Sequence, residues 1–346
     1  MAKIYDKIID HPGAWTSAQM PTKKHFQHDL PASLLDAFDE ALKKAEGVDT
    51  ESITRAHFAH PVVNKFAGDL FHDLQEGRGL VCIEALPSDR YSHADMGRIF
   101  WGVGTHLGRA VSQSVLGDRL GSIKNESDKD PDARAYRHKR ELIMHTDSTE
   151  IIGMLSLVKA KTGGFSQAAS SLAVHNAIYK ENPQHLQALY DGFYYSRHGE
   201  QGEGEAANTP YKVPIFSLKD DKVSCRYLRA YMLSAARDLG IELPQSFMDA
   251  LNCFDKTAAR RDIMFEYMME PGEMTFMNNF TVLHSRTAFE DHPEEPRKRH
   301  LLRLWLDVPN GRPVAREIDT YRQTSEGGGG IARQEGKVPS FKVVTD

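Results

Sequence analysis

The triplet His145-Thr146-Asp147 lies between two short apolar runs near the middle of the 346-residue chain. Residues 141–144 precede it and residues 151–158 follow it, and both runs have the length and composition of buried β-strands. In a strand, residues i and i+2 point to the same side, so His145 and Asp147 can contact one ion. The triplet therefore predicts a β-rich core that presents an imidazole and a carboxylate on one face.

A second triplet of the same type, His93-Ala94-Asp95, provides an internal comparison. It follows a polar segment and precedes a helical pattern at residues 96–101, with Ser92 in the position of a helix cap. Residues two apart in a helix lie roughly 200° apart around its axis and cannot bind the same ion. We therefore expect residues 93–95 to begin a helix and assign no metal to them.

A third ligand for the first triplet is His284, which lies 139 positions after His145 (284 − 145) in the segment 278–286. Two imidazoles and one carboxylate on one side of a metal leave its opposite side open. Non-haem iron oxygenases use this arrangement to bind a co-substrate and O₂. We predict that His145, Asp147 and His284 bind iron(II).

Two arginines precede and interrupt an apolar strand-like run near residue 300. Strand alternation places Arg299, Leu301, Arg303 and Trp305 on one face. If that face is the interior, both guanidinium groups need anionic partners, and a guanidinium binds a carboxylate through two parallel hydrogen bonds. We consider a solvated strand end for Arg299 less compatible with its position 15 residues after His284 (299 − 284).

The composition excludes several other classes of function. A net charge of −5 and a pI near 6.4 give no reason to expect nucleic acid or an anionic membrane as a partner. No apolar run approaches the ~20 residues of a membrane span, and the N-terminal residues lack the apolar core of a signal peptide. Three widely spaced cysteines suggest neither a disulfide framework nor a zinc site. We expect a cytoplasmic protein with a small-molecule substrate, and the sequence does not indicate an oligomeric state.

Three regions follow from the pattern of apolar residues. Residues 1–77 are expected to form a helical and irregular N-terminal cover, residues 78–310 the core, and residues 311–346 a C-terminal tail. A helical insertion is expected at about residues 230–260. The expected short strands are 79–83, 111–115, 120–123, 213–218, 223–227, 263–267, 274–277 and 300–306.

Two segments are candidates for covering the site. Residues 125–141 are polar and charged without a period, which is typical of either a mobile lid or a solvated connector. Residues 338–344 follow a glycine run and are more apolar than a free tail, so they are candidates for docking on the core.

These motifs together resemble one family of enzymes. His145-x-Asp147, Gly163-Gly164 followed two positions later by Ser166, His284, and the pair Arg299 and Arg303 are similar to the motifs of the TauD/TfdA family. This is the family of taurine dioxygenase-like, iron(II)- and 2-oxoglutarate-dependent oxygenases, and the spacing resembles its clavaminate synthase-like branch. The resemblance runs from about residue 78 to residue 310. It implies a mainly β fold with surrounding helices, built on a double-stranded β-helix, also called a jelly-roll or cupin-like core.

The resemblance also implies a role for each residue. The two histidines and Asp147 bind Fe(II), and Arg299 binds the distal carboxylate of 2-oxoglutarate. Ser166 occupies a position where many members have a threonine that also binds this carboxylate. Arg303 occupies a position where members have a residue that contacts the acidic group of the substrate. The sequence departs from the family at Phe165-Ser166, where an Asp-Thr pair is common.

The implied activity is the oxidation of a small acidic metabolite, such as an amino acid or a carboxylate, with O₂ and 2-oxoglutarate. Hydroxylation is the default outcome, and desaturation or cyclisation are alternatives that share its first step. A cupin-like zinc or manganese hydrolase or isomerase is a second interpretation, against which Arg299 and Arg303 argue. A catalytically inactive binding protein is a third, and the presence of all three metal ligands gives it no support.

Overall fold

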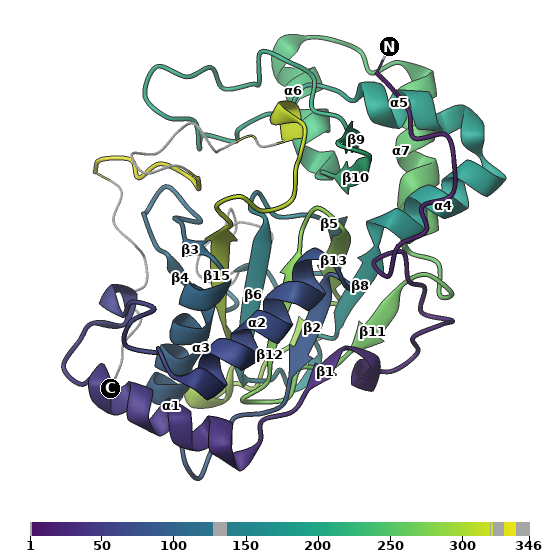
Figure 1. Ribbon diagram of the computed structural model, residues 1–346. Helices are drawn as coiled ribbons and strands as arrows, with labels where there is room; N and C mark the ends of the chain where they lie inside the picture. The colour runs from purple at the N-terminus through teal and green to yellow at the C-terminus, as the bar shows by residue number, and fades with distance from the viewer. Residues whose placement is uncertain (1, 127–136, 319, 321–328, 337–346) are drawn as a thin grey trace.

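The fold consists of two facing β-sheets with helices packed outside them (Figure 1), in a computed structural model that describes residues 2–126, 137–318, 320 and 329–336. The larger sheet has seven strands and the smaller has four. All described pairings are antiparallel except that of β1 with β2.

The larger sheet has the order β1 (Gln27–His28), β2 (Leu80–Ile83), β12 (Met274–Asn278), β6 (Ile151–Val158), β15 (His300–Asp307) and β3 (Arg109–Ala110), and β4 (Leu120–Ile123) also pairs with β15. The smaller sheet has the order β11 (Phe265–Tyr267), β8 (Ser166–Ser170), β13 (Val282–Arg286) and β5 (Leu142–His145). Two further pairs stand apart, β9 (Phe216–Lys219) with β10 (Lys222–Cys225), and β7 (Thr162–Gly163) with β14 (Phe289–Glu290).

Alternation along β15 separates the two faces of the larger sheet. Leu302 and Leu304 pack in a cluster with the N-terminal helices, whereas Leu301 and Trp305 pack in a second cluster with residues of the smaller sheet. The inner faces of the two sheets therefore share one core, and the expected orientation of this strand is confirmed.

Three helices cover the outer face of the larger sheet, namely α1 (Ala32–Lys44), α2 (Pro61–Gln75) and α3 (His93–Leu107) (Figure 1). Helix α3 packs closely on β15 at Gly104. A Cβ atom at this position would lie only 2.8 Å from a methyl group of Leu304. Ser92 and Asp95 form a capping box at the start of this helix. The second His-x-Asp triplet is thus a helix start, as expected.

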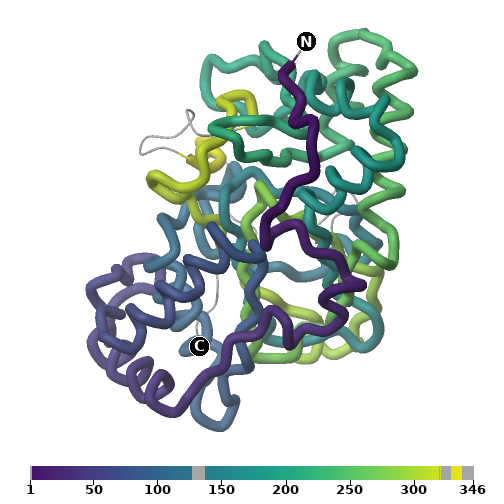
Figure 2. Tube along the Cα trace, turned by 45° about the vertical axis from the view of Figure 1, so that its right-hand side comes forward, coloured from purple at the N-terminus to yellow at the C-terminus, as the bar shows by residue number. Residues whose placement is uncertain are grey.

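A second group of helices surrounds the β9–β10 hairpin at the other end of the molecule. It consists of α4 (Ser171–Glu181), α5 (Leu186–Asp191), α6 (Arg229–Leu239) and α7 (Gln245–Ala258), and the last two are helical where helices are expected, at about residues 230–260. The N-terminal segment runs between the two ends (Figure 2), with a hydrogen bond from Ile9 to Asn176 on α4 and one from Trp15 to the Arg78 carbonyl. The 3₁₀ turns are Lys23–Phe26, Thr50–Ser52, Pro183–His185, Glu295–Arg297 and Arg316–Ile318.

Two expected strands differ from the structure. Residues 111–115 are not a strand but part of a turn, closed by hydrogen bonds from the Gln113 amide to Asp118 and from the Gly117 amide to Ser114. The short strand of this region, β3, ends at Ala110 instead. The strand expected from residue 213 begins only at Phe216, because Pro214 has no amide hydrogen to donate to a ladder.

Other expectations concern regions that are described only in part. Residues 127–136 of the expected loop, and residues 338–344 of the tail, lie outside the described residues. Among the helices that are described, none is long and apolar enough to span a lipid bilayer.

Candidate metal centre

The two histidines meet through strand pairing. His145 ends β5 and His284 lies within β13, and these residues are direct partners in the antiparallel register. Their ring centroids are 4.4 Å apart. Both imidazoles therefore project to the same side of the smaller sheet.

Asp147 reaches the histidines from a loop and not from the strand. Strand β5 ends at His145, and the Thr146 amide then donates a hydrogen bond of 2.8 Å to the carbonyl of Tyr227. The Asp147 amide donates to Asn279 Oδ1 at 3.1 Å. One ligand atom from each of His145, Asp147 and His284 lies within 4.8 Å of the other two. The carboxylate and imidazoles thus converge as the sequence predicts, although by a different local route.

The protonation states suit a divalent metal. Burial lowers the pKa of His284 to about 3, with a further contribution from the neighbouring His145 ring. Burial alone would raise the pKa of Asp147, but Arg303 and both imidazoles outweigh it and lower this pKa to about 2. Near neutral pH the centre therefore offers a neutral imidazole at His284 and an ionised carboxylate, which are the forms that bind metals.

The hydrogen bonds of the two rings also fit a metal. His145 Nδ1 lies 2.8 Å from the carbonyl of Ile143, which makes Nδ1 the donor and leaves the lone pair on Nε2. The buried Nδ1 of His284 has no hydrogen-bond partner among the residues that the structure describes. No described protein group therefore occupies this ring nitrogen.

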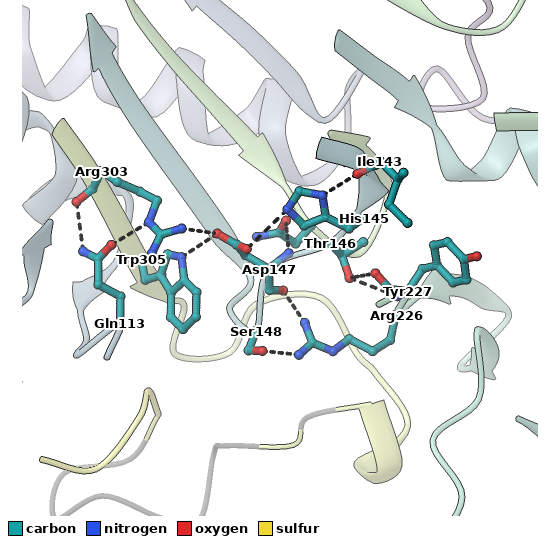
Figure 3. A network of polar contacts seen from close by, with 11 residues as sticks. Gln113, Ile143, His145, Thr146, Asp147, Ser148, Arg226, Tyr227, Arg303 and Trp305 are labelled. Carbon is teal, nitrogen blue, oxygen red and sulfur yellow. Dashed lines mark hydrogen bonds and ion pairs between the residues drawn. The ribbon is translucent and has the colours of Figure 1, made fainter. Parts of the chain in front are cut away.

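Arg303 and Trp305 project from β15 of the opposite sheet onto Asp147 (Figure 3). Trp305 Nε1 donates to Asp147 Oδ2 at 2.8 Å, and Arg303 Nη1 donates to the same oxygen at 3.2 Å. Arg303 Nε donates to Gln113 Oε1 at 2.6 Å. The family resemblance implies a substrate contact for Arg303, whereas its guanidinium here contacts a candidate metal ligand.

Arg299 occupies a different position in the same cavity between the sheets. Its side chain is buried, and its guanidinium lies 5.0 Å from the centroid of the Phe289 ring. Within the described ranges its guanidinium has no hydrogen-bond or ion-pair partner, although the Arg299 amide donates to Asp291 Oδ1 at 2.8 Å. Burial, reinforced by the nearby Arg286, lowers its pKa. The Asp291 carboxylate opposes this shift only in part, and a buried cation without a direct ion-pair partner favours an anionic ligand at this point.

The glycine pair beside Arg299 has a geometric function. Gly164 has φ +73°, and a Cβ atom there would lie 3.3 Å from Arg299 Nε. Two residues later, Ser166 lines the same cavity as Arg299 and His284. The candidate contacts of the co-substrate thus face one space.

Two residues of this centre, Arg286 and Gln113, are not among the predicted site residues. Arg286 follows His284 by two positions, lines the same cavity, and donates hydrogen bonds to the carbonyls of His138 and Arg140. Strand alternation from His284 could have identified it. Gln113 carries no comparable pattern in the sequence.

Comparison with known proteins places this geometry in a family. Residues 33–305 match the family model described as taurine catabolism dioxygenase TauD, TfdA family. FR-33289 synthase of Streptomyces rubellomurinus (strain ATCC 31215) is 29% identical over 333 residues, which cover 93% of this chain and 97% of that protein. Taurine hydroxylase-like protein SAT17 of Stachybotrys chartarum (strain CBS 109288 / IBT 7711) is 25% identical over 317 residues, covering 87% of this chain and 80% of that one.

Solved structures share the fold at low sequence identity. Asparagine oxygenase in complex with Fe(II), 2S,3S-3-hydroxyasparagine and succinate has a TM-score of 0.64 and 13% identity, covering 82% of this chain and 94% of that one. The non-haem iron oxygenase OrfP in complex with Fe and alpha-ketoglutaric acid has a TM-score of 0.58 and 12% identity, with the same coverage of 82% and 94%. The extent of the family match, together with the convergence of the three ligands, shows that the chain belongs to the TauD/TfdA family of iron(II)- and 2-oxoglutarate-dependent dioxygenases.

Proposed function

We propose that His145, Asp147 and His284 hold iron(II), that Arg299 binds the distal carboxylate of 2-oxoglutarate, and that the enzyme oxidises a small acidic metabolite of the amino-acid type. The observation that carries this proposal is that three ligand atoms converge, and that two of their residues, His145 and His284, line one cavity with the buried Arg299, whose guanidinium has no ion-pair partner in the described chain. Hydroxylation is the default outcome.

Each protein group has a separate task in this proposal. When bound, iron would activate O₂ with two electrons from 2-oxoglutarate, which leaves as succinate and CO₂, so that the second oxygen atom can be inserted into an unactivated C–H bond. His145, Asp147 and His284 fix the metal on one side, and the facing sheets exclude water. Arg299 orients the co-substrate through its far carboxylate, and the Ser166 hydroxyl is proposed to assist it.

The substrate class rests on the structural relatives. Asparagine oxygenase has been solved with 2S,3S-3-hydroxyasparagine, and OrfP with (3S)-hydroxy-L-Arg. Both bound molecules are hydroxylated amino acids. They support an amino acid or a close analogue as the substrate here, and they favour hydroxylation over desaturation or cyclisation.

We also infer that the core is a double-stranded β-helix. Two facing antiparallel arrays with a metal centre between them support this interpretation. The division into a cover of residues 1–77, a core of residues 78–310 and a tail of residues 311–346 stays a prediction, as does a cytoplasmic location. The family match begins at residue 33, within the proposed cover.

The test is the release of succinate. The protein is supplied with ferrous iron, 2-oxoglutarate and O₂, together with a panel of amino acids, sulfonates and small carboxylates. We expect at least one amino acid to stimulate succinate formation and to gain one oxygen atom by mass spectrometry. The variant His145→Ala should abolish both signals.

A matched control uses the other triplet. His93→Ala removes a histidine from the start of α3, outside the metal centre, and should leave succinate release intact. Equal activity of the His145→Ala and His93→Ala variants would contradict the proposed metal site. Absence of any 2-oxoglutarate turnover in the wild-type protein with iron would contradict the proposed reaction.

A further inference from the structure

The backbone of Asp147 is held on both sides. Its amide donates to Asn279 Oδ1, and its carbonyl accepts a hydrogen bond from Arg226 Nη1. Asn279 directly follows β12, and Arg226 directly follows β10, so two separate elements fix the loop at this residue. The backbone that carries the Asp147 side chain is therefore fixed by protein contacts alone.

The carboxylate is held asymmetrically. Trp305 Nε1 and Arg303 Nη1 both donate to Oδ2, at 2.8 and 3.2 Å. Oδ1 instead faces His145 Nε2 at 3.8 Å and has no hydrogen-bond donor in the described ranges. One oxygen is thus occupied by two protein donors, and the other is directed toward the histidines.

Arg303 is itself fixed from behind by Gln113 (Figure 3). Gln113 Oε1 accepts from Arg303 Nε at 2.6 Å, and Gln113 Nε2 donates to the carbonyls of Arg303 and Arg119, both at 3.0 Å. Gln113 is only 2% exposed, and a Cβ atom at Gly121 would lie 2.5 Å from its Oε1. Gly121 therefore provides the space in which this amide can reach the guanidinium.

From these contacts we propose that Gln113, Arg303 and Trp305 form a brace that positions Asp147 for metal binding through Oδ1 alone. This inference rests on the proposed metal site. In this role Arg303 is a positioning residue and not the partner of the acidic group of the substrate. If Arg303 bound that anion instead, it would have to give up a charge-assisted hydrogen bond to the ionised Asp147 in a buried site.

The consequence is a fixed number of open positions at the metal. A carboxylate that turned to bind through both oxygens would take one more of them. Two donors on Oδ2 oppose this rotation, because the rotation would break both hydrogen bonds inside the core. Loss of an outer partner of a metal ligand typically weakens metal affinity by roughly 10- to 100-fold.

The experiment measures the dissociation constant of Co(II), with its visible absorption as readout, without 2-oxoglutarate and without O₂. Trp305→Phe keeps the ring but removes the Nε1 donor, and Arg303→Lys keeps the charge but cannot contact Gln113 and Asp147 together. We expect each variant to bind Co(II) about 10- to 100-fold more weakly than wild type. We also expect an altered Co(II) spectrum at saturation.

Trp101→Phe is the matched control. Its Nε1 also makes a buried hydrogen bond, of 2.9 Å to the carbonyl of Ile53, but it lies among the N-terminal helices. In the presence of chelator, this variant should lose about as much thermal stability as Trp305→Phe. Its Co(II) affinity should stay within about twofold of wild type. If Trp101→Phe lost as much Co(II) affinity as Trp305→Phe, the effect would come from lower overall stability, and Trp305 would have no specific role in positioning Asp147.

A kinetic comparison separates the two roles of Arg303. The brace predicts that Arg303→Lys, saturated with metal, changes the KM for substrate by less than about threefold. Unchanged Co(II) affinity combined with a strongly raised substrate KM would overturn the brace and restore the substrate contact. Because Co(II) binding is measured without turnover, a failure of the proposed oxygenation would be seen separately, as absent succinate in the wild type.

Discussion

At the scale of single residues, Arg299 carries the co-substrate site. Its guanidinium is buried beside the cavity without a direct ion-pair partner in the part of the chain that is described; burial and the nearby Arg286 lower its pKa, and Asp291 opposes them only in part. Two buried cations on one side of a cavity create a strong local preference for a dianionic ligand. The carboxylate of 2-oxoglutarate would relieve this unfavourable charge.

The first prediction concerns Arg299→Gln. This change removes the charge and the paired donors, and a hydrogen bond to a charged group contributes roughly 1.5–3 kcal/mol. We expect the KM for 2-oxoglutarate to rise by about 10- to 100-fold, measured by succinate release at saturating iron. The Co(II) affinity should stay near the wild-type value, because Arg299 contacts no metal ligand; a KM that did not move would remove Arg299 from the co-substrate site.

A second residue-scale prediction concerns acid stability. His175 is fully buried on α4, its Nε2 lies 3.0 Å from the Tyr190 hydroxyl, and burial lowers its pKa to about 4. In the unfolded chain the imidazole has a pKa near 6.5, so between these values the unfolded state binds the proton and the folded state does not. Stability is therefore complete above about pH 6.5 and falls as the pH drops toward 4.

His175→Gln tests this linkage, because glutamine can still bond to Tyr190 but does not titrate. On the wild-type pKa values, the loss of unfolding free energy from pH 7.5 to 5.0 should be smaller in the variant by about 2 kcal/mol. Urea unfolding in chelator at both pH values gives this difference. His300 and His284 also have lowered pKa values but are present in both proteins. If the unfolding free energy depended on pH in the same way in both proteins, His175 would not be a source of the loss of stability in acid.

At the scale of elements, the metal-binding loop depends on the β9–β10 hairpin and on the C-terminal segment. Arg226 follows the hairpin and donates to the Asp147 carbonyl and to Ser148 Oγ. Arg312 lies beyond β15; its amide donates to Glu150 Oε1, and its side chain donates to the Val223 carbonyl on β10. Arg226 thus joins the hairpin to the metal-binding loop, and Arg312 joins the C-terminal segment to both.

The third prediction therefore concerns Arg226→Met. The change leaves the Asp147 carbonyl without this donor and loosens the loop, so we expect Co(II) affinity to fall by about 10-fold. Arg229→Met is the matched control, because Arg229 pairs with Asp255 at 2.6 Å within the helical insertion. Both variants should be less stable, but only Arg226→Met should bind metal more weakly. Equal Co(II) affinities in the two variants would show that Arg226 contributes to the stability of the fold and not to metal binding.

Elements with local signals could be predicted from the sequence, and contacts between distant elements could not. Ser92 and Asp95 cap a helix through their own backbone neighbours, so the pattern alone identifies the start of α3. Asp147 instead depends on Tyr227 and Asn279, which hold its loop from far along the chain. Residues 111–115 have the alternation of a strand, yet Gln113 uses its side chain to bond Arg303, 190 positions away. No local propensity encodes that contact.

At the scale of the whole molecule, the metal centre connects the two sheets. The histidines belong to the smaller sheet, whereas Trp305 and Arg303, which hold Asp147, belong to the larger one. Arg299 directly precedes β15, which belongs to the larger sheet. Metal and co-substrate would therefore bind across the interface between the sheets, and binding free energy should appear as stability of the entire fold.

The last prediction follows from this linkage and is measured by thermal unfolding without O₂. A ligand at 100 times its Kd adds about 2.7 kcal/mol to the folded state, which corresponds to a Tm shift of several degrees for a chain of this size. We expect Co(II) to raise the Tm of the wild type and 2-oxoglutarate to raise it further only when Co(II) is present. His284→Ala should lose both shifts, whereas Arg299→Gln should keep the first and lose about half or more of the second, because we expect its affinity for 2-oxoglutarate to be about 10- to 100-fold weaker. A 2-oxoglutarate shift that persisted in chelator, or in His284→Ala, would mean that the diacid binds independently of the metal, and the two sheets would then hold separate sites.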